Sequence, residues 1–428
     1  MDRSLWAVIL GTFTLRFSTG LTGAMLAVYL AKLPEHGGPE VDGLVVGIFA
    51  ATFYLAELVL SPFFGMLSDR IGHHRVMLYG PAFGAVAVIL TAITTNLVLL
   101  GGTRWLEGAS TAASVPSILG YIAMVTANDQ ALRGRAAARF EGATLLGLGC
   151  GIVLAPILFA AIGPVAFLAN AVIYGVSYLI YWRGVDDPAG EAATLTASHY
   201  GFRRYRALLT SAHVWLLAPT WIAVNASIGL WLHQSIFQLT AARPEFPDQL
   251  FHGGFEPWQI SLGAAGVAVL FGAGLLYWGS RFRRFRRTTI ILYGILGGGA
   301  MVVAGLVLNH SAGVTPLITL PALLVAAFGL FVLAGATPAA LGLLADVSER
   351  FPADRGAIMG LYSVFLAVGQ IIGAVIGGVA ADIRGIDAMF VATLVLLAVA
   401  LVPLAQLRRD EHYVGGPAGT AMIDGEIG

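Results

Sequence analysis

The order of apolar and polar positions along the chain predicts a membrane protein made of helices. Continuous apolar runs recur from one end of the sequence to the other, and each is long enough to cross a hydrocarbon core of about 30 Å as a helix. The runs do not alternate apolar and polar residues, as the strands of a transmembrane barrel would, so the predicted fold class is all-α. We predict twelve spans: residues 5–33, 43–67, 76–94, 98–125, 136–160, 163–183, 208–238, 257–280, 288–308, 315–345, 356–380 and 387–407.

The composition and the placement of charge support this prediction. Of the 428 residues, 57% are hydrophobic and 11% are charged, against about 25% charged residues in a typical soluble domain. Among the positive residues between the spans, only Lys32, Arg243 and Arg384 fall on one side of the predicted membrane. By the positive-inside rule both termini are then cytoplasmic, which requires an even number of spans. We expect an integral protein of a bacterial inner (plasma) membrane.

The spans divide into two related sets of six. We predict an N-terminal six-helix bundle at 1–185, a central cytoplasmic loop at 186–207, a C-terminal six-helix bundle at 208–408 and a flexible cytoplasmic tail at 409–428. Short patterns recur in the same order in both sets: Gly65, Arg70, Gly80 and Gly84 return as Gly279, Arg284, Gly294 and Gly298, and Pro116, Gly120, Gly147 and Gly151 return as Pro338, Gly342, Gly369 and Gly373. Two duplicated bundles form a natural site at the midplane between them, and rocking one bundle on the other exposes that site to each side in turn. This is the geometry of a carrier.

The stretch GMLSDRIGHHRV, which begins at Gly65, interrupts two apolar runs with charged and small residues. Its Gly, Leu, Asp, Arg and Gly positions resemble the loop motif G-x-L-x-D-R-x-G-R-[KR] of the major facilitator superfamily, with His73 and His74 where the family usually has Arg or Lys. The resemblance implies that Asp69 meets the N-terminal end of the helix that begins just after Arg355, where the helix dipole favours an anion. The cytoplasmic gate that it implies consists of Gly65, Asp69, Arg70, Gly72 and Arg355.

Two further patterns resemble motifs of the same family. The stretch RWLEG at Arg104 to Gly108 resembles R-x-x-Q-G, with Glu107 in place of Gln, and the resemblance associates this Arg with proton coupling. A structural pair between Arg104 and Glu107 is the alternative interpretation. Residues 151–160 resemble, in degenerate form, the G-x-x-x-G-P-x-x-G-G motif of exporters, which favours export, although a packing face of small residues would explain the pattern too.

Ionisable residues within the spans are candidates for function, because a charge at bilayer depth costs a few kcal/mol or more. Arg16 and Glu57 lie about 15 Å from the same interface at 1.5 Å per residue, so they can pair. We hypothesise that Glu57 carries a proton when the pair separates, with Glu107 and Glu141 as rival carriers. A static ion pair between the first two helices remains the alternative.

The seventh span, APTWIAVNASIGLWLHQSIFQL, is the most polar and aromatic span of the second half. The candidates for lining the substrate cavity are Trp221, Asn225, Trp231 and Gln234, together with Tyr54 and Gln370. Aromatic rings with scattered amide groups suit an amphipathic organic substrate better than a sugar. Anchoring at the membrane interface would explain Trp231 equally well.

The motifs of other protein classes are missing from the sequence. It has no H-E-x-x-H, G-x-S-x-G or P-loop pattern, so we do not expect an enzyme, and we expect no cofactor and no metal site. The basic run at Arg281 to Arg287 is juxtamembrane, where anionic lipid headgroups are more natural partners than nucleic acid. We therefore predict a monomeric secondary transporter that works by alternating access, with protons, membrane lipids and a small molecule as its partners. Proton-coupled export of small amphipathic or lipophilic compounds is the leading prediction, and uptake, facilitated diffusion or lipid translocation are the alternatives.

Overall fold

The described part of the chain is helical. The computed structural model describes residues 3–126, 129–186, 214–282, 284–312, 316–350 and 355–409, without the side chains of residues 130, 131, 214, 347–350 and 355–360. Nearly all of the predicted central loop and tail therefore lie outside the described residues. The elements in chain order are α1 (Arg3–Ala31), η1 (Leu33–His36), α2 (Gly43–Ile71), α3 (His73–Met77), α4 (Tyr79–Ala92), α5 (Leu97–Val125), α6 (Gln130–Ile162), α7 (Val165–Gly184), η2 (Val214–Leu216), α9 (Ala218–Thr240), α10 (Pro257–Gly279), α11 (Arg287–Asn309), α12 (Pro316–Leu333), α13 (Ala336–Arg350) and α14 (Arg355–Arg409).

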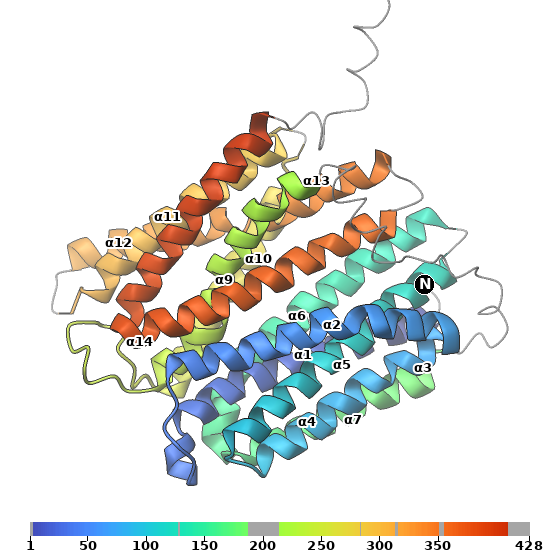
Figure 1. The fold of residues 1–428 in the computed structure, drawn as a ribbon, viewed down its shortest axis with the longest axis horizontal. Helices are drawn as coiled ribbons and strands as arrows, with labels where there is room; N and C mark the ends of the chain where they lie inside the picture. Colours follow the sequence, from blue (N-terminus) through green and yellow to red (C-terminus); the bar gives the residue numbers. More distant parts are fainter. Residues whose placement is uncertain are drawn as a thin grey trace, which may run out of the picture.

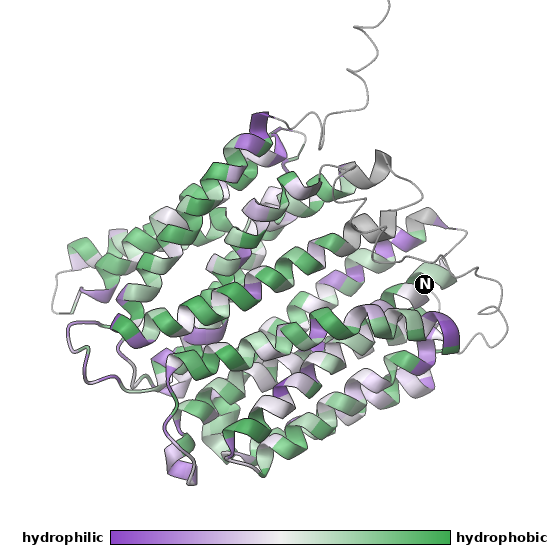
Figure 2. Ribbon diagram, viewed as in Figure 1, coloured by the Kyte–Doolittle hydropathy of each residue, from purple (hydrophilic) through white to green (hydrophobic). Residues whose placement is uncertain are grey.

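Among the described residues, nine helical segments are long and apolar enough to cross a membrane. They correspond to ten of the predicted spans, because the segment Leu361–Arg409 carries the last two. The remaining two predicted spans are helices as well, α1 with 29 residues and α9 with 23, but they do not belong to the nine. Figure 2 shows hydrophobic residues along the long helices and hydrophilic residues gathered in the connections. The all-α membrane fold is thus confirmed, while the count of twelve spans stays a prediction.

The long helix α14 reverses direction at one point. Arg384 and Gly385 have non-helical backbone angles, and Gly385 has a φ of 56°, a conformation that glycine adopts without steric cost. A side chain at this position would also come within 2.8 Å of the Phe246 ring. Figure 1 shows the two arms of α14, residues 355–383 and 386–409, running away from and back toward the same side of the molecule.

The repeated residues make equivalent contacts in two bundles, α1 to α7 and α9 to α14. A Cβ atom placed on Gly65 would lie 3.7 Å from Pro116, and one placed on Gly279 would lie 3.8 Å from Pro338. In the same way His73 packs on Gly120 in the first bundle and Arg287 packs on Gly342 in the second. These are the contacts that a duplicated six-helix unit predicts.

The two bundles meet closely at one face of the molecule. We call this face, which carries η1 and the turn of α14, the loop face, and the other, which carries Arg3 and Arg409, the terminal face. Near the loop face α2 crosses the first arm of α14 so closely that a side chain on Gly47 would overlap the backbone of Ala374. Figure 1 shows that α2 and the first arm of α14 lie close together there and spread apart toward the terminal face.

Candidate functional site

Polar side chains from both bundles meet half-way along the helices. The ring of Tyr54 on α2 lies edge-on against the ring of His233 on α9, with 5.3 Å between the centroids. His233 Nε2 in turn lies 3.2 Å from the side-chain oxygen of Gln370 on α14. The sequence predicts that Tyr54 and Gln370 line a cavity, and His233 joins them into one group. His233 itself was not predicted, although an ionisable residue within an apolar run is a signal of function.

Arg16 and Glu57 lie next to this group but do not form the expected ion pair. Arg16 Nη1 donates a hydrogen bond of 3.5 Å to Thr111 Oγ1 on α5. Glu57 is close enough to Arg16 for an electrostatic interaction, yet within the described part of the chain no hydrogen bond or ion pair joins its carboxylate. Arg16 interacts electrostatically with Glu141 on α6 as well. Both Arg16 and Glu57 are only half-buried, although each lies about half-way along its helix.

Arg104 and Glu107 form an ion pair inside the first bundle, which confirms the structural contact that their spacing suggested. Their side chains are 9% and 1% exposed. The guanidinium of Arg104 also lies over the ring of Phe53, 4.9 Å from its centroid. Glu107 Oε1 is buried without a hydrogen-bond partner among the described residues. A carboxylate held in this way is a buried charge that depends on a single cation.

Three of the predicted cavity residues lie instead inside the second bundle. Trp221 is 1% exposed and stacks on Tyr362, so its ring belongs to the hydrophobic core. Asn225 is buried, and its amide donates to the backbone oxygen of Trp221 one turn earlier. Trp231 donates from Nε1 to Thr393 Oγ1 on the second arm of α14. In this structure all three side chains pack within the second bundle, because helical spacing does not fix which neighbour a face meets, and their place in a substrate cavity stays a prediction.

Gln234 acts at the boundary between the bundles. Its side-chain nitrogen donates a hydrogen bond of 2.8 Å to the backbone oxygen of Gly43 at the start of α2. Gln238, one turn along α9, donates to the side-chain oxygen of Gln234. Gln234 is fully buried, so its role in this structure is to join the bundles rather than to face an open space.

The predicted gate residues lie at the terminal face. Gly72 ends α2 with a φ of 103°, which makes the tight turn into α3. The side chain of Asp69 is 63% exposed, and its Oδ1 lies 3.9 Å from Nε2 of His73. Arg70 is exposed, and Gly65 packs beside Pro116. Arg355 begins α14, but its side chain lies outside the described residues, so the expected contact of Asp69 with this helix end stays a prediction.

A carboxylate joins the bundles at the loop face. Asp382, near the end of the first arm of α14, accepts hydrogen bonds from the backbone N–H groups of Gly43 (2.7 Å) and Leu44 (2.8 Å), the first two residues of α2. The positive end of a helix stabilises an anion in this position. Arg243 Nη2 lies 3.5 Å from the same carboxylate. Together with the bond from Gln234, these hydrogen bonds tie the two bundles to each other near the loop face.

One group of side chains at the loop face has the composition of a metal site. Ligand atoms of Asp248, His310 and Asp387 lie within 4.8 Å of one another. However, Arg384 bonds to Asp248 at 3.0 Å and approaches Asp387 at 3.9 Å. Its guanidinium already compensates the two carboxylates, so the cluster is a network of ion pairs within the second bundle.

The chain resembles known transporters along most of its length. Residues 8–341 and 252–423 match the Major Facilitator Superfamily. The chain is 23% identical over 397 residues to the quinolone resistance protein NorA of Staphylococcus aureus (strain MSSA476). This match covers 90% of this chain and 91% of that protein. It is 27% identical over 354 residues to multidrug resistance protein 1 of Bacillus subtilis (strain 168). This match covers 80% of this chain and 82% of that protein.

The fold is also similar to that of a solved transporter. The structure of the nucleoside transporter NupG superimposes with a TM-score of 0.71 at 13% sequence identity, and the match covers 96% of this chain and 99% of that one. Two bundles of apolar helices with polar groups at their boundary define a membrane transporter. The chain belongs to the Major Facilitator Superfamily and is an integral membrane protein.

Proposed function

We propose that this transporter exports small amphipathic or lipophilic organic compounds in exchange for protons, by alternating access of a site between its bundles. The names of the relatives concern resistance to quinolones and to multiple drugs, which export of such compounds would confer. Both relatives match this chain over at least four-fifths of its length. A nucleoside carrier is the second candidate, because the nucleoside transporter NupG has a similar fold.

The position of Glu57 is the observation that carries the proposal. Its carboxylate is half-buried midway along α2, near the positive charge of Arg16, and no hydrogen bond or ion pair within the described residues holds it. A carboxylate in this setting gains a proton when its site faces an acidic compartment and loses it when Arg16 draws near. Proton binding and the position of Arg16 are therefore coupled, which a proton-driven exchanger requires.

The contacts at the loop face support a conformation that is closed on that side. Asp382 and Gln234 join the bundles there, while α2 and the first arm of α14 spread apart toward the terminal face. With the terminal face in the cytoplasm, as the positive-inside rule predicts, a compound from the cytoplasm or inner leaflet would reach the site near Tyr54, His233 and Gln370. Closure at the terminal face, through Asp69 and the start of α14, would accompany opening of the loop face.

Transport into inside-out membrane vesicles tests the proposal. With an acidic lumen, export predicts that ethidium accumulates in the vesicles while protons leave, and that collapse of the pH gradient stops accumulation. Glu57→Gln should abolish this accumulation but retain exchange of labelled for unlabelled ethidium without a gradient, because exchange needs no proton transfer. Glu107→Gln and Glu141→Gln test the two rival carriers.

The results separate the candidate functions. Full gradient-driven accumulation by Glu57→Gln would contradict the role of Glu57, and loss in Glu107→Gln alone would transfer that role to Glu107. Accumulation of labelled uridine by intact cells, with no transport of ethidium in vesicles, would favour the nucleoside carrier instead.

A further inference from the structure

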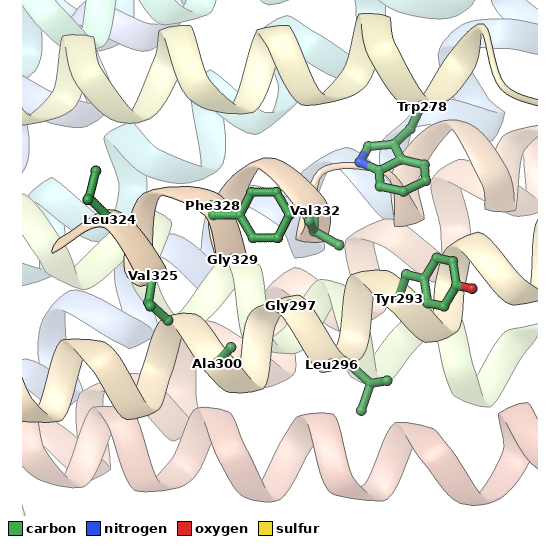
Figure 3. Close-up of a pocket in the computed structure, with 10 residues that line it drawn as sticks. All are labelled: Trp278, Tyr293, Leu296, Gly297, Ala300, Leu324, Val325, Phe328, Gly329 and Val332. Carbon is green, nitrogen blue, oxygen red and sulfur yellow. The ribbon is translucent and has the colours of Figure 1, made fainter. Parts of the chain in front are cut away.

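An apolar groove lies on the periphery of the second bundle, away from the boundary between the bundles. Ten residues of α10, α11 and α12 line an open groove of about 590 Å³, which is in the range of small-molecule sites. Figure 3 shows its lining, which runs from the rings of Trp278 and Tyr293 at one end to Leu324 and Val325 at the other.

The groove opens toward the surroundings of the bundle rather than toward its core. Leu296, Leu324 and Phe328 on its walls are 55%, 61% and 68% exposed. Its floor lies where α11 and α12 approach closely at Gly297 and Gly329, since a Cβ atom on Gly297 would lie 3.0 Å from the Gly329 oxygen. Because Gly297 and Gly329 have no side chains, nothing fills the groove above this floor. In a membrane protein, a groove with this lining faces lipid chains.

One end of the groove is aromatic and carries a hydrogen-bond donor without an acceptor. The rings of Trp278 and Tyr293 lie 6.3 Å apart, and Phe285 lies beside both. Trp278 Nε1 is buried and has no hydrogen-bond partner among the described residues. In Figure 3 this nitrogen is on the side of the indole turned toward Phe328 and Val332, along the groove. Tryptophan and tyrosine are enriched at the depth of lipid headgroups.

The turn between α10 and α11, at the same end, is strongly basic. It holds Arg281, Arg284 and Arg286, and none of them takes part in an ion pair within the described residues. Arg281 lies over the Tyr277 ring, 4.7 Å from its centroid, and its Nε atom is buried without a partner in that part of the chain. The neighbouring Arg287 differs, because it pairs with Asp346. The end of the groove therefore carries positive charge that no carboxylate of the described ranges balances.

We propose that this groove binds one anionic phospholipid. An acyl chain would lie along Leu296, Ala300 and Phe328, the ester region would meet the aromatic end, and the phosphate would contact the arginines of the turn. Basic pockets between membrane helices bind anionic headgroups in this manner. A lipophilic cation fits less well, because it would meet uncompensated positive charge. The inference does not depend on which solute is transported.

Lipid binding to the purified full-length protein tests the proposal. Native mass spectrometry would measure the fraction of protein that carries phosphatidylglycerol or phosphatidylcholine of matched chains. We expect a preference for phosphatidylglycerol, lowered about fivefold by each of Arg281→Gln and Arg284→Gln. Ala300→Trp should fill the groove and lower binding of both lipids. Ala160→Trp, at an exposed position of the first bundle, is the matched control.

A second substitution separates binding from folding. Trp278→Phe keeps an aromatic ring but removes the N–H donor, and we expect weaker retention of phosphatidylglycerol in protein that a melting curve shows to be folded. Equal retention of the two lipids by the unaltered protein would overturn the proposal. Unchanged retention of both lipids by Ala300→Trp would also overturn the proposal. If Ala300→Trp loses ethidium binding but keeps its lipid, the groove is a site for the transported substrate.

Discussion

Tyr54 and His233 come from different bundles and lie in edge-on contact, with their ring planes at 64°. Such a pair stabilises the joined arrangement by about 0.5–1.5 kcal/mol beyond the apolar area that it buries. Because the contact joins α2 to α9, any rotation of one bundle against the other has to break or reshape it. Gln370 lies beside His233 within the second bundle, with its side-chain oxygen 3.2 Å from His233 Nε2.

Tyr54→Ala should make the transporter leak. Without the ring, the arrangement that is closed at the loop face loses an aromatic contact between the bundles, and the open arrangement becomes about two- to tenfold more populated. We expect faster passive leak of ethidium from loaded proteoliposomes without a pH gradient, together with slower gradient-driven transport. Tyr54→Phe keeps the ring and should behave as the unaltered protein. Equal leak rates for the Ala and Phe variants would show that the ring contact does not help to close this face.

Asp382→Asn should open the loop face. The carboxylate accepts two backbone hydrogen bonds from the start of α2, and a hydrogen bond to a charged group contributes about 1.5–3 kcal/mol. Loss of the charge should shift the balance between closed and open arrangements by roughly tenfold. Spin labels at the exposed positions Glu40 and Pro247, with the exposed Cys150 replaced by Ser, would report a larger population of long distances.

Asp248→Asn provides the matched control for this experiment. Asp248 is another carboxylate of the loop face, but its ion pair with Arg384 lies within the second bundle. Its loss should leave the distance between the labels unchanged. A shift of equal size in both variants would mean that the charge of the face, rather than the contact with α2, determines the distance.

The sequence predicted the helices well because their signal is local. The length of each apolar run and the charges between the runs placed the long helices, including the break between residues 380 and 387 where α14 turns at Gly385, but not the short helix α3 or the break between α12 and α13. The helices α1 and α9 are less apolar because they carry buried polar residues, such as Thr12 on α1 and Gln234 on α9. These residues bond inside the protein, so the helices do not need a fully apolar surface.

The site was harder to predict because its contacts join distant parts of the chain. The depths of Arg16 and Glu57 followed from their positions along their helices, but the rotation of a helix about its axis does not follow from spacing. Because this rotation could not be predicted, the hydrogen bond from Arg16 to Thr111 could not be predicted either. Asp382 and Gly43 lie more than 300 positions apart in the sequence, so their contact exists only after both bundles have folded.

Loss of one partner from the buried pair of Arg104 and Glu107 should destabilise the first bundle. Both side chains are nearly inaccessible, and removing one charge leaves the other buried without compensation, which costs about 3–5 kcal/mol. We expect Glu107→Leu to lower the melting temperature of the purified protein strongly, since Arg104 loses its carboxylate partner and keeps a contact with the Phe53 ring. The double variant Arg104→Met with Glu107→Leu should recover most of that loss, because apolar residues of similar volume replace a buried pair at little cost.

If the double variant is stable but no longer accumulates ethidium in vesicles, the pair serves transport rather than folding. If it is stable and transports normally, the pair is structural, and the search for the proton carrier narrows to Glu57 and Glu141.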